Sequence, residues 1–380
     1  MVTAGRRVLI LSAGMGAGHD GVAAELARRL VADGAEAEII DVLQLLPLRL
    51  GPMLRSGYQW VIRHAPWLYE ATYQLFFVAK RAPSTSPLTL LAAASLARLA
   101  GRHRPDEVVS TFHLAAQVTG WLRRRGRIRA RSTVLVTDFA VHRLWLHPGN
   151  DRYLCPNPAM TGHITAMTGR PALCTAPVVR PRFRPRAAEC ARTRARIGAD
   201  PGDLLVLVSA GSWGAGAVRE TARVLASSGR YRPVVLCGHN ARLRNRLGCG
   251  GTVLALGWRD DVPELMSAAH ALVDNAAGLT CVEAFAAGLP VVSYRPIPGH
   301  GRDGALAMAR AGFSVHAPDA AALLDALDRL RDERQRDLQI ARASALFTST
   351  PAVAALMSAP ADLPPASAGP ATGRAGSCHR

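Results

Sequence analysis

Short apolar runs alternate with amphipathic helical patterns along most of this chain, and the alternation restricts the folds that the chain can adopt. Apolar runs separated by helices are typical of parallel β-sheets with helices on both faces. Ten runs are predicted strands: Arg7–Ser12, Ala37–Asp41, Glu107–Ser110, Val134–Thr137, Arg152–Cys155, Leu204–Ser209, Pro233–Cys237, Thr252–Leu256, Ala271–Asp274 and Val291–Tyr294. The sequence therefore predicts an α/β protein.

The chain of 380 residues is too long for one ordinary core, so two domains are expected. The stretch "RPRFRPRAAECARTRARIGADPGD" interrupts the alternation. We predict a domain at residues 1–185, a linker at 186–203 and a second domain at 204–350. Residues 358–380 are rich in Pro, Gly, Ser and Ala and are predicted to be disordered.

Each half opens with a strand and a glycine-rich turn. In "LSAGMGAGHDGVAAELARRL", Gly16, Gly18 and His19 stand between an apolar run and a helix, and "SAGSWGAG" at 209–216 repeats this order. Glycine lets backbone N–H groups approach a ligand, and a helix start carries partial positive charge. The turns therefore favour a phosphate or another anion, although a tight connection without a ligand is equally compatible with the first turn.

The charge balance points to anionic partners. The net charge is +18, and Lys80 is the only lysine. A basic chain attracts phosphorylated substrates, acidic lipid headgroups or nucleic acid, but no nucleic-acid-binding signature is present, so we expect no nucleic acid. The seven cysteines form no CxxC pair, which indicates neither a zinc site nor a disulfide framework. We expect a cytoplasmic protein without a signal peptide or transmembrane segment.

The segment 48–81 combines aromatic residues with cations. Trp60, Arg63, Trp67 and Tyr69 belong to it. This combination is typical of an interfacial segment that binds anionic lipid. A pair of core helices that breaks at Pro66 is the alternative.

The second half carries a further candidate site in "AGLTCVEAFAAGLP". A glycine again precedes a helix, and Glu283 follows in its first turns. A carboxylate at such a place can accept hydrogen bonds from a ribose diol. Compensation of the helix dipole is the simpler alternative.

Several motifs together resemble one enzyme family. They are "GMGAGHDGVAAELARRL", "VTDFAVHRLWLHPGNDRYLCPN", "CGHN", "LGWRDDVPELMSAAHALV", "GLTCVEAFAAGLPVV" and "PIPGHGRDGA". The set resembles the GT-B glycosyltransferases of the monogalactosyldiacylglycerol synthase and processive diacylglycerol glucosyltransferase family, which is related to the lipid I N-acetylglucosaminyltransferase of peptidoglycan synthesis. The resemblance extends from Arg6 to Leu346 and implies two Rossmann-like domains that face a cleft.

The resemblance implies transfer of a hexose from a UDP-sugar to a lipid hydroxyl, with inversion and without a cofactor. The chain has no Asp-x-Asp metal motif, so we expect metal-independent transfer. It further implies a peripheral enzyme at the inner face of the plasma membrane, with a UDP-sugar, a lipid acceptor and an anionic membrane surface as partners.

Residue roles also follow from the resemblance. His19 is the expected general base, and Asp138 either orients it or is the base itself. His142 is a further residue of the cleft. Backbone groups at Gly16, Gly18, Gly211, Ser212, Gly214, Gly278, Leu279 and Thr280 would hold the diphosphate; Asn240, Gly257, Trp258, Arg259 and Glu283 would hold the nucleoside side; His300 and Asp303 would face the sugar.

The sugar-facing block departs from the family pattern. Relatives usually have Gln near the position of His300 and Asn at that of Gly304, so glucose, galactose and N-acetylglucosamine all remain open. A GT-B enzyme with a soluble acceptor, a UDP-sugar epimerase and a non-catalytic nucleotide-sugar-binding protein are the alternatives.

Overall fold

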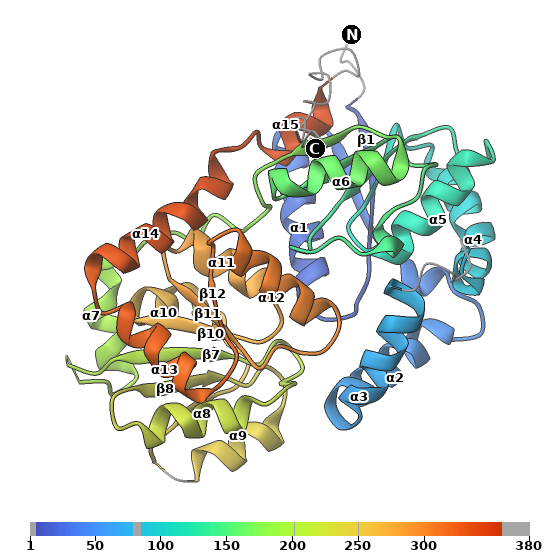
Figure 1. Ribbon diagram of the computed structural model, residues 1–380. Coiled ribbons are helices and arrows are strands. Elements are labelled where there is room, and N and C mark those ends of the chain that lie inside the picture. Colours follow the sequence, from blue (N-terminus) through green and yellow to red (C-terminus); the bar gives the residue numbers. More distant parts are fainter. Residues whose placement is uncertain (1–4, 79–84, 201, 250, 359–380) are drawn as a thin grey trace, which may run out of the picture.

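The computed structural model describes residues 5–78, 85–200, 202–249 and 251–358. Among the predicted tail residues only Ser358 is described, and the others lie outside this part of the chain. The described residues form two six-stranded sheets, each entirely parallel, with helices on both faces (Figure 1). The predicted α/β architecture with two Rossmann-like halves is confirmed.

The first sheet has the strand order β2-β1-β3-β4-β5-β6. Its inner strands β1, β3, β4 and β5 are mostly buried, whereas the edge strand β2 is partly exposed. β1 pairs with β2 on one side and β3 on the other. Their bounds are β1 Arg7–Ser12, β2 Glu36–Asp41, β3 Glu107–Ser110, β4 Arg131–Leu135, β5 Arg152–Cys155 and β6 Ala172–Cys174.

The second sheet has the order β12-β11-β10-β7-β8-β9. Its central strand β7 pairs with β10 and β8. The bounds are β7 Leu205–Ser209, β8 Arg232–Leu236, β9 Leu254–Leu256, β10 Ala271–Asp274, β11 Val291–Tyr294 and β12 Val315–Ala317.

Helices cover both faces of each sheet and bury a separate core on every face. Those of the first half are α1 Ala17–Ala32, η1 Val42–Leu45, α2 Leu50–His64, α3 Pro66–Tyr73, η2 Gln74–Val78, α4 Pro87–His103, α5 His113–Arg124, η3 Arg143–Trp145 and α6 Pro158–Thr168. The remaining helices are α7 Ala187–Arg196, α8 Val218–Ser227, α9 Ala241–Gly248, α10 Val262–Ala268, α11 Leu279–Ala286, α12 His300–Arg310, α13 Ala320–Arg329, α14 Glu333–Ser344, η4 Ala345–Thr348 and α15 Ala352–Met357.

The predicted linker has helical structure of its own. Residues 186–203 include α7, which packs against α10 of the second half. All ten predicted strands are present within three residues of their expected bounds, and the two strands that the sequence pattern missed, β6 and β12, have three residues each.

The end of the described chain returns to the first half. After α14 the chain crosses over, Ala176 forms a β-bridge with Pro351, and α15 packs its apolar side against the core beneath β1 (Figure 1). The last helix that the structure describes is thus part of the first half rather than the second.

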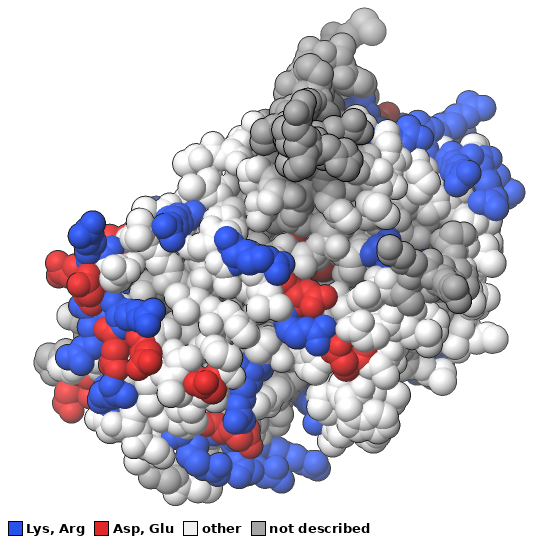
Figure 2. Space-filling view, in the orientation of Figure 1, with Lys and Arg blue, Asp and Glu red and all other residues white. Residues whose placement is uncertain are grey.

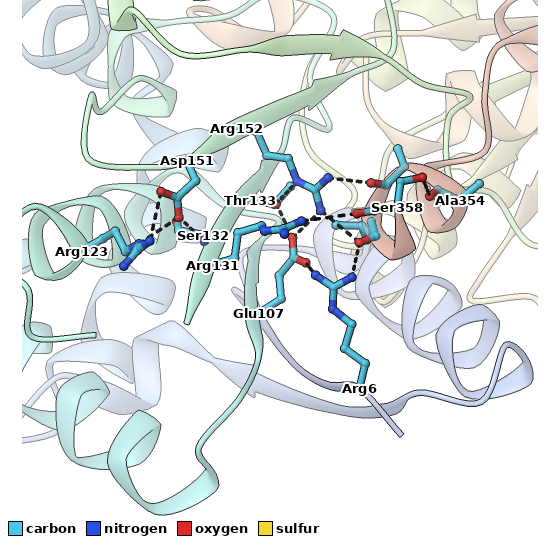
Figure 3. A network of polar contacts seen from close by, with 12 residues as sticks. Arg6, Glu107, Arg123, Arg131, Ser132, Thr133, Asp151, Arg152, Ala354 and Ser358 are labelled. Carbon is cyan, nitrogen blue, oxygen red and sulfur yellow. Dashed lines mark hydrogen bonds and ion pairs between the residues drawn. The ribbon is translucent and has the colours of Figure 1, made fainter. Parts of the chain in front are cut away.

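A buried ion pair holds the carboxyl end of α15 (Figure 3). The Glu107 carboxylate accepts hydrogen bonds from Arg6, Thr133 and Arg152. Arg152 also donates to the carbonyls of Ala355 at 2.6 Å and Leu356 at 3.1 Å, which belong to the last turn of α15. Cations at that end complement the helix dipole and occupy carbonyls that have no partner within the helix.

Candidate functional site

A large cavity lies between the two halves and is lined by residues of both. Its volume is about 1460 Å³, and its lining includes the carboxyl ends of β7 and β10. Ligands of open α/β sheets bind at this edge. Both glycine-rich turns line the cavity, at residues 15–22 and 209–213, so the two predicted anion sites face one shared space.

The two turns also touch each other. The Ala17 N–H at the start of α1 donates to the Ser212 hydroxyl at 3.3 Å. A Cβ atom on Gly21 would come within 2.8 Å of a Leu279 methyl group, so α1 approaches the start of α11 closely. The start of α1 in the first half therefore contacts both Ser212 and the start of α11 in the second half.

His19 lies in the first turn of α1, at the wall of the cavity. Its Nδ1 is 3.0 Å from the Thr111 carbonyl oxygen and 3.1 Å from the Thr137 hydroxyl oxygen. A ring that donates from Nδ1 to a carbonyl keeps its proton there and leaves the Nε2 lone pair for another group. The arrangement suits a general base.

Asp138 lines the same cavity but does not orient His19. Its carboxylate accepts a hydrogen bond from the Trp145 indole N–H at 2.8 Å and lies 3.9 Å from His142 Nε2. The hydrogen bonds of His19 go instead to Thr111 and Thr137, which corrects the orienting role expected for Asp138. No pattern in the sequence indicates that the main-chain carbonyl of Thr111 would be a partner of the His19 ring.

Two further histidines next to His19 are neutral. Burial lowers the pKa of His113 to about 3 and holds that of His142 well below its usual value, with smaller contributions from neighbouring histidines. Their rings pack together with centroids 5.3 Å apart, and each also contacts Phe77. This side of the cavity is aromatic and carries little charge.

The donor side of the cavity is built around the start of α11. The buried Asp274 carboxylate ends β10 and accepts hydrogen bonds from the N–H groups of Ala276 at 2.8 Å and Ala277 at 2.6 Å. These bonds fix a loop in which Ala277 has a φ of +51°, and the residues that follow it, Leu279 and Thr280, line the cavity at the start of α11. Asp274 was missed by the sequence analysis, although an Asp at a strand end before a glycine is a usable signal.

Glu283 lines the cavity one turn further along α11. Its Oε1 accepts a hydrogen bond from Arg180 at 2.8 Å. Burial raises the pKa of the Glu283 carboxyl, and Arg180 acts in the opposite direction. Arg180 also lines the cavity and is a second residue that the sequence analysis did not single out.

Gly257, Trp258 and Arg259 line the cavity as a group, as expected for one side of a nucleoside site. The Trp258 ring stacks on His239 at a centroid distance of 4.4 Å. Arg259 is held by Asp261 at 2.6 Å.

Three predicted donor-site residues are not part of the described cavity lining. Asn240 instead caps α9 through Leu243 N–H and donates to the Gly214 carbonyl at 3.1 Å. Gly214 has a φ of +62° and permits this close approach. Asp303 accepts a hydrogen bond from Tyr73, whereas His300 and Gly278 do line the cavity.

The predicted acceptor and membrane residues separate into two groups. Trp60 and Trp67 are exposed, at 56% and 71%, whereas Tyr69 is buried and lines the cavity. Arg63 donates to the Trp213 carbonyl of the second half. In Figure 2 the surface over α2 and α3, at the lower right, is largely uncharged.

Among the residues that the structure describes, no group of three or more His, Cys, Asp and Glu side chains is placed to hold a metal ion. In the same ranges, no helix is both long and apolar enough to cross a bilayer.

The two facing sheets and the cavity between them define a GT-B glycosyltransferase, and known proteins agree. MurG of Acinetobacter baumannii superposes with a TM-score of 0.57 at 16% identity, covering 92% of this chain and 98% of that chain. The spinosyn rhamnosyltransferase SpnG, solved with thymidine diphosphate, superposes with a TM-score of 0.61 at 16% identity, with the same coverage.

Comparisons of the sequence show which protein families this chain is similar to. Residues 19–169 match the model of monogalactosyldiacylglycerol synthase, and residues 217–333 match that of group 1 glycosyl transferases. A processive diacylglycerol β-glucosyltransferase of Bacillus subtilis is 26% identical over 79% of this chain and 80% of its own length. One from Bacillus cereus is 25% identical over 89% and 88%. These matches support placing the chain with the GT-B glycosyltransferases that include monogalactosyldiacylglycerol synthases and processive diacylglycerol glucosyltransferases.

Proposed function

We propose that the protein transfers a hexose from a UDP-sugar to the free hydroxyl of a diacylglycerol-type lipid, with inversion and without a metal ion. The observation that carries the proposal is one cavity whose lining has two different parts. Glycine-rich turns and the start of α11 form one part of its lining, and an apolar wall from residues 43–117 forms another.

The apolar side of the cavity has the properties of a lipid site. Its described lining between residues 43 and 117 has no Asp, Glu, Lys or Arg and comes mainly from η1, α2, α3, η2, α4 and α5. Leu43, Leu54, Ile62, Leu88 and Leu114 belong to it. A typical small-molecule pocket is roughly 300–1,000 Å³, so a cavity of about 1460 Å³ leaves room for an acceptor beside a nucleotide sugar.

The transfer step follows from the residues on either side. The acceptor hydroxyl gives its proton to His19 Nε2 while its oxygen forms a bond to the anomeric carbon. The bond from that carbon to the diphosphate breaks, and UDP leaves with the electron pair. Attack opposite the leaving group inverts the anomeric centre.

The departing diphosphate needs its charge stabilised. Main-chain N–H groups at Gly211 and Ser212 and at the start of α11 supply donors, and the α11 dipole adds positive potential. Glu283 would hold the ribose, and His300 would face the sugar. Trp60 and Trp67 would dock the enzyme at an anionic bilayer surface.

Radiolabelled UDP-glucose, UDP-galactose and UDP-N-acetylglucosamine, each incubated with diacylglycerol in anionic vesicles, test the proposal. We expect label in the lipid fraction with one donor, retained after addition of EDTA, and a β-linked product by NMR from the α-linked donor. Label in a water-soluble product would favour a soluble acceptor, and conversion of the UDP-sugar alone would favour an epimerase. Binding of a UDP-sugar without turnover would favour a non-catalytic protein.

A further inference from the structure

An arm of the first half reaches across to the second half. We define the arm as Leu50–Val78, which comprises α2, α3 and η2. Arg63 of the arm donates from Nε to the Trp213 carbonyl at 3.1 Å, and the Tyr58 ring meets the Trp213 ring edge-on at 5.7 Å. The arm therefore contacts the turn after β7 directly.

Its next helix, α3, contacts the start of α12. The Tyr69 hydroxyl oxygen lies 2.7 Å from His300 Nδ1. One turn further on, the Tyr73 hydroxyl donates to Asp303 at 3.0 Å. Both tyrosines are buried, at 6% and 2% exposure, so these hydrogen bonds are largely protected from water.

Glu70 of the same helix completes the contact. Its carboxylate accepts from the Gly299 N–H at 2.9 Å and pairs with Arg302 at 2.9 Å. Burial opposes ionisation, but hydrogen bonds from Gln74 and Arg302 outweigh it and lower the pKa of the Glu70 carboxyl. Because α12 has no side-chain cap of its own, a carboxylate from the other half binds at its start.

Gly299 permits the close packing. Its φ is +71°, and a Cβ atom there would lie 2.8 Å from Tyr73 Cγ and 2.9 Å from Tyr69 Cε1. A side chain at this position would push α3 away from α12. The backbone conformation and the close contact thus depend on the same glycine.

We propose that the arm forms one wall of the donor-sugar subsite and that Tyr69 is the positioning residue that fixes the ring of His300. This inference rests on the proposed function, in which His300 faces the sugar. His300 lines the cavity, and the hydrogen bond of Nδ1 to Tyr69 fixes the rotation of the ring. Nε2 is then the ring nitrogen that a sugar hydroxyl can reach, so residues of both halves determine how the sugar is bound.

Calorimetric binding of UDP and of the three UDP-sugars to the full chain tests this. Loss of one hydrogen bond costs about 1 kcal/mol, or roughly a fivefold change in affinity. For Tyr69→Phe we expect the Kd of the preferred UDP-sugar to rise about fivefold, while the Kd of UDP changes less than twofold. A role limited to overall stability would weaken both ligands alike and would overturn the inference.

A matched substitution and a double-mutant cycle sharpen the test. Tyr231→Phe also removes a buried tyrosine hydroxyl and its hydrogen bond to Asp328, away from the cavity, and should leave both Kd values unchanged. In a His300→Ala background, Tyr69→Phe should add nothing. Additive effects would show that Tyr69 does not act through His300.

The two proposals fail in different ways. If the wild-type protein binds none of the three UDP-sugars, the proposed donor class is wrong and the role of Tyr69 is wrong with it. If it binds one and Tyr69→Phe binds that sugar equally well, only the role of Tyr69 is wrong. In steady-state assays, the expected signature is a raised KM for the donor with an unchanged KM for the lipid.

Discussion

His19 acquires its proposed role from two threonines that are distant in the sequence. Thr111 follows β3 and Thr137 follows β4, and both bring an oxygen to the same ring nitrogen. Because a carbonyl oxygen can only accept, the Thr111 contact places the proton on Nδ1. The opposite nitrogen is therefore the basic one.

We expect His19→Ala to lower kcat by about 10²–10⁴-fold, the usual contribution of a general base. The KM for the UDP-sugar should change little, because the ring acts on the acceptor. Steady-state kinetics with saturating lipid measures both. His163→Ala on the exposed side of α6 is the matched control and should behave as wild type. Near-normal kcat in His19→Ala would exclude this ring as the base.

The neutral histidines predict a specific loss of stability in acid. Below pH 6.5 the unfolded chain takes up a proton on His113, whereas the folded chain does not do so until the pH is near 3. The unfolded state is therefore favoured increasingly as the pH falls through this window, by about 1.4 kcal/mol for each pH unit.

Urea unfolding at pH 7.5 and pH 5.5 measures this effect. Between these two values, His113→Gln should lose about 1.4 kcal/mol less of its free energy of unfolding than the wild type does. His163→Gln is the control and should retain the wild-type difference. An equal loss in His113→Gln would mean that this ring takes up its proton over the same pH range in the folded and the unfolded protein.

At the scale of elements, the arm has two chemically different faces. Its inner face holds Tyr69 and Tyr73 against α12, and its outer face exposes Trp60 and Trp67. Arg55 is exposed on the same segment, and the exposed Arg49 directly precedes it. The outer face suits an anionic bilayer, because aromatic rings enter the interface and arginines attract its charge.

We expect the double variant Trp60→Ala, Trp67→Ala to bind anionic vesicles at least about tenfold more weakly, since it removes apolar area that the bilayer would bury. Flotation with vesicles measures this binding. The pair Met167→Ala, Leu338→Ala removes similarly exposed apolar side chains from α6 and α14 and should bind normally. Equal loss in both double variants would indicate non-specific adhesion.

The buried contact of Glu107 and Arg152 at the end of α15 is a second feature at this scale, and its contribution to the free energy of unfolding can be measured. Glu107→Ala would leave Arg152 buried without its carboxylate, which destabilises by about 3–5 kcal/mol. Arg230→Ala breaks an ion pair that is partly exposed and should cost less than about 1 kcal/mol. Urea unfolding distinguishes the two. A small effect of Glu107→Ala would mean that water reaches Arg152.

At the scale of the whole molecule, two halves share one ligand space. The turn at Gly18 belongs to the first half, and the turn at Gly211 to the second, yet both line the same cavity. A diphosphate there would contact main-chain N–H groups from both. The affinity for UDP should therefore depend on the position of the two halves relative to each other.

A negative charge in the first turn tests this sharing. A Cβ atom on Gly18 makes only ordinary contact, with Leu279 Cβ at 3.7 Å, so Gly18→Asp should fold. We expect it to weaken UDP binding by roughly ten- to hundredfold through repulsion at short range. Gly162→Asp on α6, where the surrounding space is open, is the control. Unchanged UDP affinity in Gly18→Asp would place the diphosphate away from α1.

Sequence patterns predict local structure well where several signals coincide. Buried strands such as β1 and β11 are mostly apolar, and their bounds were predicted to the residue. The edge strands β6 and β12 were missed because three residues carry too little periodicity. The Gly-rich turns and the α11 start were identified because backbone requirements are visible in the residue type.

Contacts between distant segments could not be predicted in the same way. Tyr69 belongs to a segment whose aromatic and basic composition predicts a membrane surface, yet its side chain packs on α12. The position of α3 depends on tertiary packing, which the local sequence does not show. Asn240 matches a donor-site motif but serves as a helix cap. Which groups approach His19 also depends on the pairing of β3 with β1 and of β4 with β3, which no local pattern reveals.

The return of α15 has a consequence for building hybrid enzymes from this family. Arg6 and Arg152 donate hydrogen bonds to carbonyls of α15, and Ala176 forms a β-bridge with Pro351. The chain therefore passes between the first and the second half twice. A swap of the nucleotide-binding part should therefore exchange an internal block that stops before residue 351 and keep α15 with its own partner. A simple two-piece fusion would place a foreign helix against the native core beneath β1 and against the arginines that bind the carbonyls of Ala355 and Leu356.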